Sequence, residues 1–372
     1  MRIDQPQFSE DRRRLAFNCC TAQGDFAVWY QSKTVELDFR TEALLTLGLL
    51  PAMREGGEFV VPESEVSARF LEGMERAQEI HRSWFDGLSG VDIKGVSPVV
   101  RPPRATSART AASFSGGVDS HYTLAVKHEE IDDLMYLHGF DDGITDPELR
   151  RRISAMLEVF GEHYGKRILE LETNARELWY ASGLRHMGGS PVVFAAVHLL
   201  PPAISRYCVP ASFCAETMVR HTWNPETLPC WATETLELVE HGGDVSRLDK
   251  VKALSRSPLV LKHLHVCWGD HGADYNCGIC EKCLRTIVAL TICGALEQSC
   301  FPGKLDLKRI ANMHLTTEHQ RGFARQSLRQ IENNPEFRGL AQALRQAACR
   351  PAWRLRLAEL YWAVKKKFGL VS

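Results

Sequence analysis

Residues 113–120 constrain this chain most, and they read Ser-Phe-Ser-Gly-Gly-Val-Asp-Ser. A strand-like apolar run at residues 110–114 leads into this stretch, and residues 121–127 favour a helix. A strand, a Gly-Gly turn and a helix start together favour an anion site, because the first N–H groups of a helix lack partners and its dipole is positive there. Gly116 and Gly117 have no Cβ, so the backbone can approach a phosphate closely.

Asp119 is the one residue of this loop that does not suit an anion site by itself. A carboxylate repels a phosphate unless a cation lies between them, which predicts Mg²⁺ bridging Asp119 and phosphate oxygens. The hydroxyls of nearby serines are donors for the same phosphate. The residues expected to bind the phosphate-bearing ligand are Ser113, Ser115, Gly116, Gly117, Val118, Asp119 and Ser120. The alternative is a Gly-Gly turn that serves only the fold.

The bulk properties fit an ordinary water-soluble protein with a sizeable core. The chain has 372 residues, 44% hydrophobic and 24% charged, which predicts two to three domains. The net charge of −1 and the lack of a basic stretch interleaved with aromatic residues argue against nucleic acid as a partner. Neither a signal peptide nor a membrane span is evident, so we expect a cytoplasmic protein.

The pattern of the chain predicts three regions. Residues 1–105 read as an N-terminal α+β region, with short strands at 15–20, 26–31 and 34–39 and a helix at 64–84. Residues 106–300 alternate between strands and helices, which predicts an α/β fold with a doubly wound parallel sheet. Residues 301–372 read as a helical C-terminal region.

Four cysteines form the second strong signal. Cys267, Cys277, Cys280 and Cys283 are spaced C-x₉-C-x₂-C-x₂-C, and Gly278 allows the tight turn between two of them. Four thiolates of this spacing predict a tetrahedral Zn²⁺ site, which is expected to be structural because sulfur fills every position. An iron–sulfur cluster and a redox pair remain alternatives. His265 and His271 are weaker candidates for replacement ligands.

The glycine-containing loop and the cysteine cluster, in this order along the chain, resemble the motifs of a known family. The Ser-Gly-Gly-Val-Asp-Ser loop resembles that of the PP-loop (N-type) ATP pyrophosphatases, a branch of the adenine-nucleotide α-hydrolase-like (HUP) folds. With the cysteines about 150 residues later, residues 109–290 resemble the zinc-bearing 7-cyano-7-deazaguanine synthases and, more distantly, asparagine synthetases. Three further matches are local, namely residues 249–254, Cys267-Trp268 and Arg285.

The resemblance implies a reaction and its participants. It implies an ATP-dependent C–N ligase that adenylates a carboxylate or amide oxygen, for attack by ammonia or an amine, with ATP, Mg²⁺ and Zn²⁺ as cofactors. Asp119, Ser120 and Lys250 are the expected catalytic residues, with Lys250 as a cationic clamp; a solvated lysine is the alternative. Arg220 is a further candidate to face the site, although a surface charge is the favoured interpretation. Arg285 is expected either to brace the metal turn or to reach the substrate.

The acceptor is left unassigned because the chain departs from the family. Lys252 stands where the family has Glu, Asp249 stands where it has Thr, and both terminal regions are extra. The expected acceptor is a small-molecule or protein carboxylate, and a homodimer is one option for assembly. Two alternatives stay open: a tRNA-modifying PP-loop enzyme, or a component acting on a partner protein in a biosynthetic or phage-defence operon.

The C-terminal stretch at residues 350–368 has basic residues alternating with apolar ones at helical spacing. A helix of this type can lie on a membrane or a partner protein. The alternative is a terminal helix that packs on the body of the protein and keeps a solvated basic face.

Overall fold

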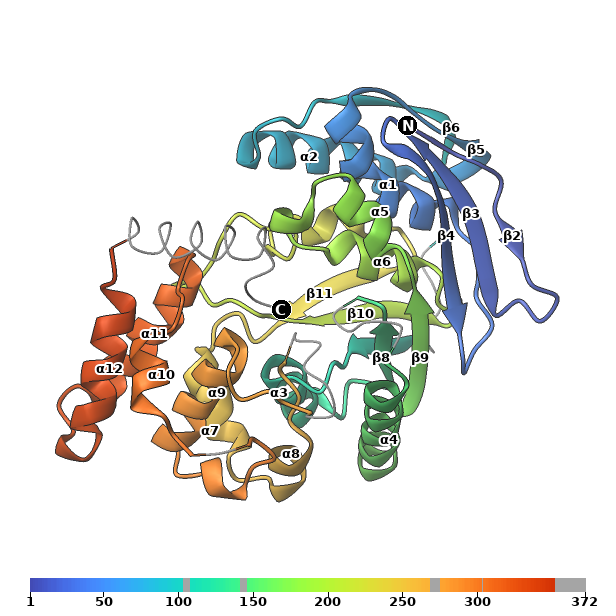
Figure 1. The fold of residues 1–372 in the computed structure, drawn as a ribbon. Coiled ribbons are helices and arrows are strands. Elements are labelled where there is room, and N and C mark those ends of the chain that lie inside the picture. Colours follow the sequence, from blue (N-terminus) through green and yellow to red (C-terminus); the bar gives the residue numbers. More distant parts are fainter. Residues whose placement is uncertain (103–107, 141–145, 268–274, 303, 352–372) are drawn as a thin grey trace. The chain divides into compact units, whose positions relative to one another are not determined.

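The computed structural model describes residues 1–102, 108–140, 146–267, 275–302 and 304–351 (Figure 1). Contacts divide the chain into two compact units. The first unit comprises residues 1–116, 123–212 and 220–242. The second comprises residues 117–122, 213–219 and 243–372. The three predicted regions, with boundaries near residues 105 and 300, differ from this grouping. The grouping is based on contacts and does not show which parts fold independently, so the three regions stay a prediction.

The first unit is built on one 11-stranded sheet. Its strands are β1 (Arg2–Ile3), β2 (Gln7–Phe8), β3 (Arg14–Thr21), β4 (Gly24–Ser32), β5 (Gly57–Ser67), β6 (Val91–Val99), β7 (Arg109–Ser113), β8 (Asp133–His138), β9 (Arg167–Thr173), β10 (Ile204–Pro210) and β11 (Glu237–His241). They lie in the order β11-β10-β7-β8-β9-β4-β3-β1-β5-β6, and β2 pairs with β3 at the side.

Five of these strands form a parallel core with a doubly wound order. β11, β10, β7, β8 and β9 pair in parallel, and in chain order they read 5-4-1-2-3 across the sheet. The order reverses between β7 and β10, since β8 and β9 follow β7 to one side and β10 and β11 lie to the other. Ligands of such sheets bind outside the carboxyl ends of the strands at this switch point. The predicted α/β class is thereby confirmed.

The N-terminal strands extend the same sheet. β4 pairs with β9 in antiparallel fashion, with Tyr30 opposite Thr173 and Ser32 opposite Leu171. β3 and β4 form the predicted strand pair, whereas the strand expected at 34–39 is absent. Residues 33–40 form a connection instead, held by the backbone of other segments, as in the bond from Leu37 N to Arg12 O.

The helices of the first unit cover the sheet. They are α1 (Thr41–Glu55), α2 (Ala68–Trp84), α4 (Pro147–Tyr164), α5 (Arg176–Ala181) and α6 (Ser190–His198); α3 (Val118–Lys127) starts in the second unit. In Figure 1, α4 lies on one side of the parallel strands and α5 and α6 on the other. Helix α2 starts at Ala68 rather than 64, because 57–67 form β5 and the Ser67 side chain caps the helix at Phe70 N.

The second unit is helical. It contains α7 (Arg247–Leu254), α8 (Pro258–His263), α9 (Glu281–Ile292), α10 (Leu307–Ala311), α11 (Glu318–Ile331) and α12 (Arg338–Ala348). Its core includes Leu284, Val288, Ile310 and Leu344, each at most 7% exposed. The predicted helical C-terminal region is confirmed as far as residue 348, and the basic stretch expected to be helical lies mostly outside the described residues. Within the described ranges, no helix has the length and hydropathy needed to cross a bilayer.

Candidate anion site and metal centre

The glycine-containing loop leaves the sheet at the carboxyl end of β7, beside the switch point. The Phe114 N–H donates to Met135 O of β8 at 2.8 Å, which keeps the chain in the sheet for one more residue. Gly116 then takes a left-handed conformation with φ of +73°, which a residue with a Cβ adopts only at a cost. Helix α3 follows, and its first bond runs from His121 N–H to Gly117 O at 3.0 Å.

The predicted phosphate ligands of this loop differ in their surroundings. The Ser113 hydroxyl lies 2.6 Å from the Tyr207 hydroxyl of β10, so it is engaged within the sheet. Ser115 is exposed, whereas the Val118 side chain is fully buried, which leaves only its backbone for contact with a ligand. Ser120 is buried and its hydroxyl donates to Gly117 O at 3.1 Å, which tightens the first turn of α3.

The structure brings the two charged residues predicted for catalysis together. Nζ of Lys250 lies 3.2 Å from Oδ1 of Asp119, across 131 residues of sequence. Lys250 is only 2% exposed, so the alternative of a solvated lysine is wrong. Helix α7 places it there, because Ser246 caps the helix at Asp249 N and the buried side of the helix includes residue 250.

Arg247 completes this arrangement one helical turn before Lys250. Its Nη1 lies 2.7 Å from Oδ2 of Asp119, and its side chain is 10% exposed. Burial by itself would raise the pKa of Asp119, but the positive charges of Arg247 and Lys250 outweigh burial and hold that pKa below its usual value. Asp119 is therefore a carboxylate at neutral pH, held between two cations.

A third cation, Arg285 of α9, adds charge to this cluster. It is close enough to affect Asp119, while its nearest carboxylate is Glu281, at 3.7 Å. Burial and then the charge of Arg247 lower the pKa of Arg285 to about 10, which leaves it protonated at neutral pH. The cluster thus holds three cations and two carboxylates.

Two buried donors in this cluster have no hydrogen bond within the described parts of the chain, namely Nε of Arg247 and Nε of Arg285. Nε of Arg285 faces Oε1 of Glu281 only as a longer ion pair, at 3.7 Å. Leaving a buried charged donor without an acceptor is costly, so a site of this kind gains free energy from binding an anion. Arg247 was not predicted from the sequence. The available signal was a pair of basic residues three apart on one helix, 247 and 250.

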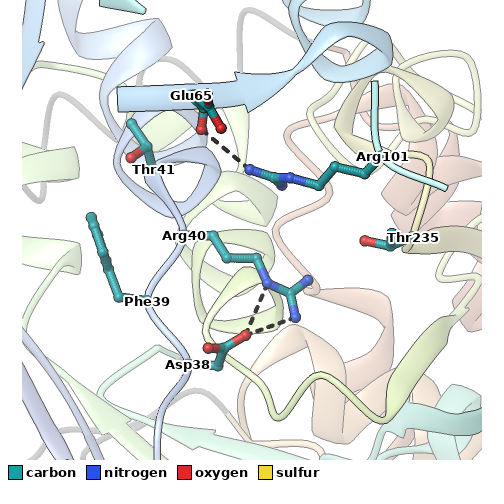
Figure 2. Close-up of a pocket in the computed structure, with 7 residues that line it drawn as sticks. All are labelled: Asp38, Phe39, Arg40, Thr41, Glu65, Arg101 and Thr235. Carbon is teal, nitrogen blue, oxygen red and sulfur yellow. Dashed lines mark hydrogen bonds and ion pairs between the residues drawn. The ribbon is translucent and has the colours of Figure 1, made fainter. Parts of the chain in front are cut away.

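Other candidates lie elsewhere. Arg220 is exposed and belongs to the first unit, as expected for a surface charge. A cavity of about 340 Å³ lies within the first unit and is lined by residues 38–41, Glu65, Arg101 and Thr235 (Figure 2). None of the predicted nucleotide-binding residues lines this cavity, so the cavity is separate from the predicted nucleotide site.

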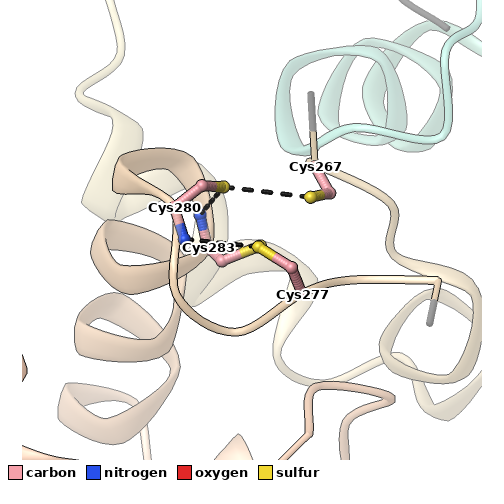
Figure 3. A group of neighbouring side chains, drawn as sticks. All are labelled: Cys267, Cys277, Cys280 and Cys283. Atoms are coloured by element: carbon pink, nitrogen blue, oxygen red, sulfur yellow. Dashed lines mark hydrogen bonds between the residues drawn. The ribbon is translucent and has the colours of Figure 1, made fainter. Parts of the chain in front are cut away.

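The four cysteines gather at one point in the second unit (Figure 3). Sγ of Cys267 lies 3.9 Å from Sγ of Cys280, Sγ of Cys277 lies 3.8 Å from Sγ of Cys283, and all four lie within 4.8 Å of one another. Tetrahedral Zn²⁺ with Zn–S bonds of about 2.3 Å places its sulfurs about 3.8 Å apart. The four cysteines can therefore hold one metal ion.

Local backbone geometry builds this centre. Gly278 takes φ of +69° between the second and third cysteines, which turns the chain back on itself. The N–H groups of Ile279 and Cys280 then point to Sγ of Cys277, at 3.4 and 3.3 Å. Sγ of Cys280 accepts from Cys283 N–H at 3.4 Å and so caps α9 at its N-terminus. The expected turn at Gly278 is confirmed.

Asn276 joins the two arms of the cysteine cluster and was missed in the sequence. It is 1% exposed; its Oδ1 accepts from Val266 N–H at 3.0 Å and its Nδ2 donates to Leu264 O at 2.8 Å. These bonds bring the chain before Cys267 alongside the chain before Cys277. An asparagine directly before the first cysteine of a C-x₂-C turn is the signal that was available.

The chemistry of the donor set also fits a cation. The thiol of Cys267 raises the pKa of Cys280 to about 11, and Cys267 and Cys280 together raise the pKa of Cys283. Cys280 and Cys283 thus keep their protons unless a positive ion compensates their thiolates, and metal binding releases those protons. His265 binds Tyr275 O through Nδ1 at 2.8 Å and stands outside the cysteine group, and His271 lies outside the described residues.

Comparisons with protein-family models, with curated proteins and with solved structures found no match for this chain. The conclusions about function therefore depend on the residues and on their geometry.

Proposed function

We propose that this chain is an adenylating ligase of the PP-loop ATP pyrophosphatase type, with a HUP-type fold and a zinc centre like that of the 7-cyano-7-deazaguanine synthases. The observation that carries the proposal is the pairing of Asp119 in the loop with Arg247 and Lys250 on α7. The motif alone is compatible with a turn that serves only the fold. Buried cations gathered at the loop favour a polyanion such as the triphosphate of ATP.

The proposed reaction has two steps. A carboxylate oxygen of the acceptor attacks the α-phosphorus of ATP, the bond from that phosphorus to the β-bridging oxygen breaks, and pyrophosphate leaves. Ammonia or an amine then attacks the carbonyl carbon of the acyl adenylate. AMP leaves with the former carboxylate oxygen, the nitrogen loses a proton to solvent, and an amide remains.

The residues of this chain would act mainly by stabilising negative charge on the reacting phosphates. Negative charge accumulates on the departing pyrophosphate, and preorganised cations and N–H groups stabilise it best when they are already in place. Lys250 and Arg247 are held in place by Asp119, and the N–H groups at the start of α3 add to them. Arg285 supplies further positive charge.

Mg²⁺ would be held by Asp119, where it would neutralise phosphate charge. Both oxygens of Asp119 are engaged by cations in the structure, so Mg²⁺ would share this carboxylate with Arg247 and Lys250. The positive charges of Arg247 and Lys250 would also offset the repulsion between Asp119 and a phosphate, in addition to Mg²⁺. Zn²⁺ would be held by the four cysteines as a structural ion, since all its coordination positions would be filled by sulfur.

The test is product analysis of ATP turnover with ATP labelled at the α-phosphate, a panel of carboxylic acids, ammonia and Mg²⁺. We expect acid-dependent release of AMP, and metal analysis of the same preparation is expected to give one zinc per chain. Asp119→Asn preserves the shape of the side chain but removes its charge, and it should lower AMP release about a hundredfold or more. Full AMP release by a folded Asp119→Asn variant, or release of ADP by the wild type, would contradict the proposal.

A further inference from the structure

The cavity of about 340 Å³ in the first unit has the features of a small-molecule site. It falls within the size range of ligand pockets and is too small for a folded partner. Its lining comes from segments that are distant in sequence, namely residues 38–41, Glu65, Arg101 and Thr235. No residue of the proposed nucleotide site takes part, so the inference is independent of the proposed function.

Two arginines point into this cavity from different segments (Figure 2). Nε and Nη2 of Arg40 donate to Oδ2 of Asp38, at 3.2 and 3.0 Å, and the Arg40 side chain is 10% exposed. Arg101 donates through Nη1 to the fully buried Glu42 at 2.9 Å and through Nη2 to the Glu65 carbonyl at 3.2 Å. Both guanidinium groups are therefore fixed before any ligand arrives.

The start of α1 adds positive potential to the same cavity. Arg40 is the N-cap of this 15-residue helix and makes no side-chain capping bond, and Thr41 is its first residue. The first N–H groups of the helix are thus left without a side-chain cap, beside two arginines and the lining hydroxyls of Thr41 and Thr235. An uncapped helix start beside two guanidinium groups is suited to a carboxylate.

The lining is also balanced in charge. Asp38 and Glu65 line the cavity with Arg40 and Arg101, which gives two acidic and two basic lining residues, and the buried Glu42 behind the lining pairs with Arg101. A phosphate or another multiply charged anion would face these carboxylates as well as the two arginines, which disfavours it relative to a ligand that also carries a positive charge. We propose that this cavity binds a small zwitterion of the α-amino acid class, with its carboxylate at Arg40, Arg101 and the start of α1 and its ammonium group at Asp38 and Glu65.

The test is isothermal titration of the full chain, supported by thermal shift, with a panel of α-amino acids. Three sets of analogues separate the charges: carboxylic acids without the amine, amino alcohols without the carboxylate, and inorganic phosphate. We expect at least one amino acid to bind, with the analogues at least tenfold weaker. Arg40→Gln should weaken binding at least tenfold, because a charge-assisted bond is lost.

A second variant keeps the test valid if Arg40→Gln does not fold. Thr235→Val keeps the volume of the side chain, removes one hydroxyl and should weaken binding severalfold. Arg76→Gln is the matched control, since Arg76 is an exposed arginine of α2 outside the cavity, and it should bind as the wild type does. The proposal is overturned if no amino acid binds, if an analogue or phosphate binds equally well, or if Thr235→Val and Arg40→Gln both bind as the wild type does.

Discussion

Lys250 illustrates how a single buried cation changes the interpretation of a sequence. On a surface its charge would be solvated and would contribute little. In the structure it lies against Asp119 at 2% exposure, and its Nζ is 5.8 Å from the centre of the Tyr122 ring. Such a residue is retained at a cost in desolvation, which is typical of a functional group.

Glu170 leads to a residue-scale prediction about pH and stability. Burial alone would raise its pKa, but hydrogen bonds from His138 at 3.0 Å, Ser154 at 2.5 Å and Lys33 at 3.1 Å lower it to about 2. The folded state thus favours the carboxylate, and its contribution is fully present above about pH 4.5. The free energy of unfolding should fall as pH decreases from about 4.5 to about 2.

The measurement is urea unfolding at a series of pH values. Glu170→Gln should reduce the loss of unfolding free energy over this pH range, and it should be less stable than the wild type at pH 7. Equal pH dependence in the two proteins would show that Glu170 does not have the lowered pKa assigned to it.

At the scale of elements, α9 depends on the cysteine cluster at its start. Cys280 caps the helix and Cys283 lies in its first turn, fully buried. Removal of the metal by a chelator, or Cys280→Ser, should therefore unfold the start of α9 and release Arg285 from its position. Hydrogen exchange of residues 281–292 should rise after chelation, and AMP formation should be lost with it. Unchanged exchange and unchanged activity in Cys280→Ser would contradict a structural metal.

Asn276 provides a second prediction at this scale. Asn276→Leu removes the two bonds that hold the arms of the cysteine cluster together but keeps the four thiols. The loss of such supporting contacts typically lowers metal affinity by about ten- to a hundredfold. Competition with a chromogenic zinc chelator measures this, and wild-type affinity in Asn276→Leu would show that the bonds do not support the centre.

Turns and loops that neighbouring residues dictate were predicted from the sequence. Helices and strands without a clear pattern of apolar residues were missed. The loop after β7 and the turn at Gly278 are local, because glycine and spacing dictate them. Helix α1 was missed because it is buried on nearly all sides, so its apolar residues show no helical period, and because Pro51 lies within it. β11 was missed because it is short and only partly apolar.

At the scale of the whole molecule, the sheet explains why the predicted regions could not be separated by pattern alone. Residues 1–105 read as a separate α+β region, yet β4 joins β9 and makes one sheet of both parts. Pairing between strands that are distant in the chain produces no recognisable pattern in the sequence of either strand. The same limit applies to the site: Arg247 and Asp119 are 128 residues apart, and only the fold brings them together.

The most direct test of the central claim is equilibrium binding of MgATP and of pyrophosphate to the full chain. Lys250→Met should weaken both at least tenfold, because a buried cation facing the phosphates is lost. Lys252→Met is the matched control on the same helix, since Lys252 is exposed, and it should bind as the wild type does. No binding by the wild type, or equal binding by Lys250→Met and Lys252→Met, would contradict a polyphosphate site at this loop.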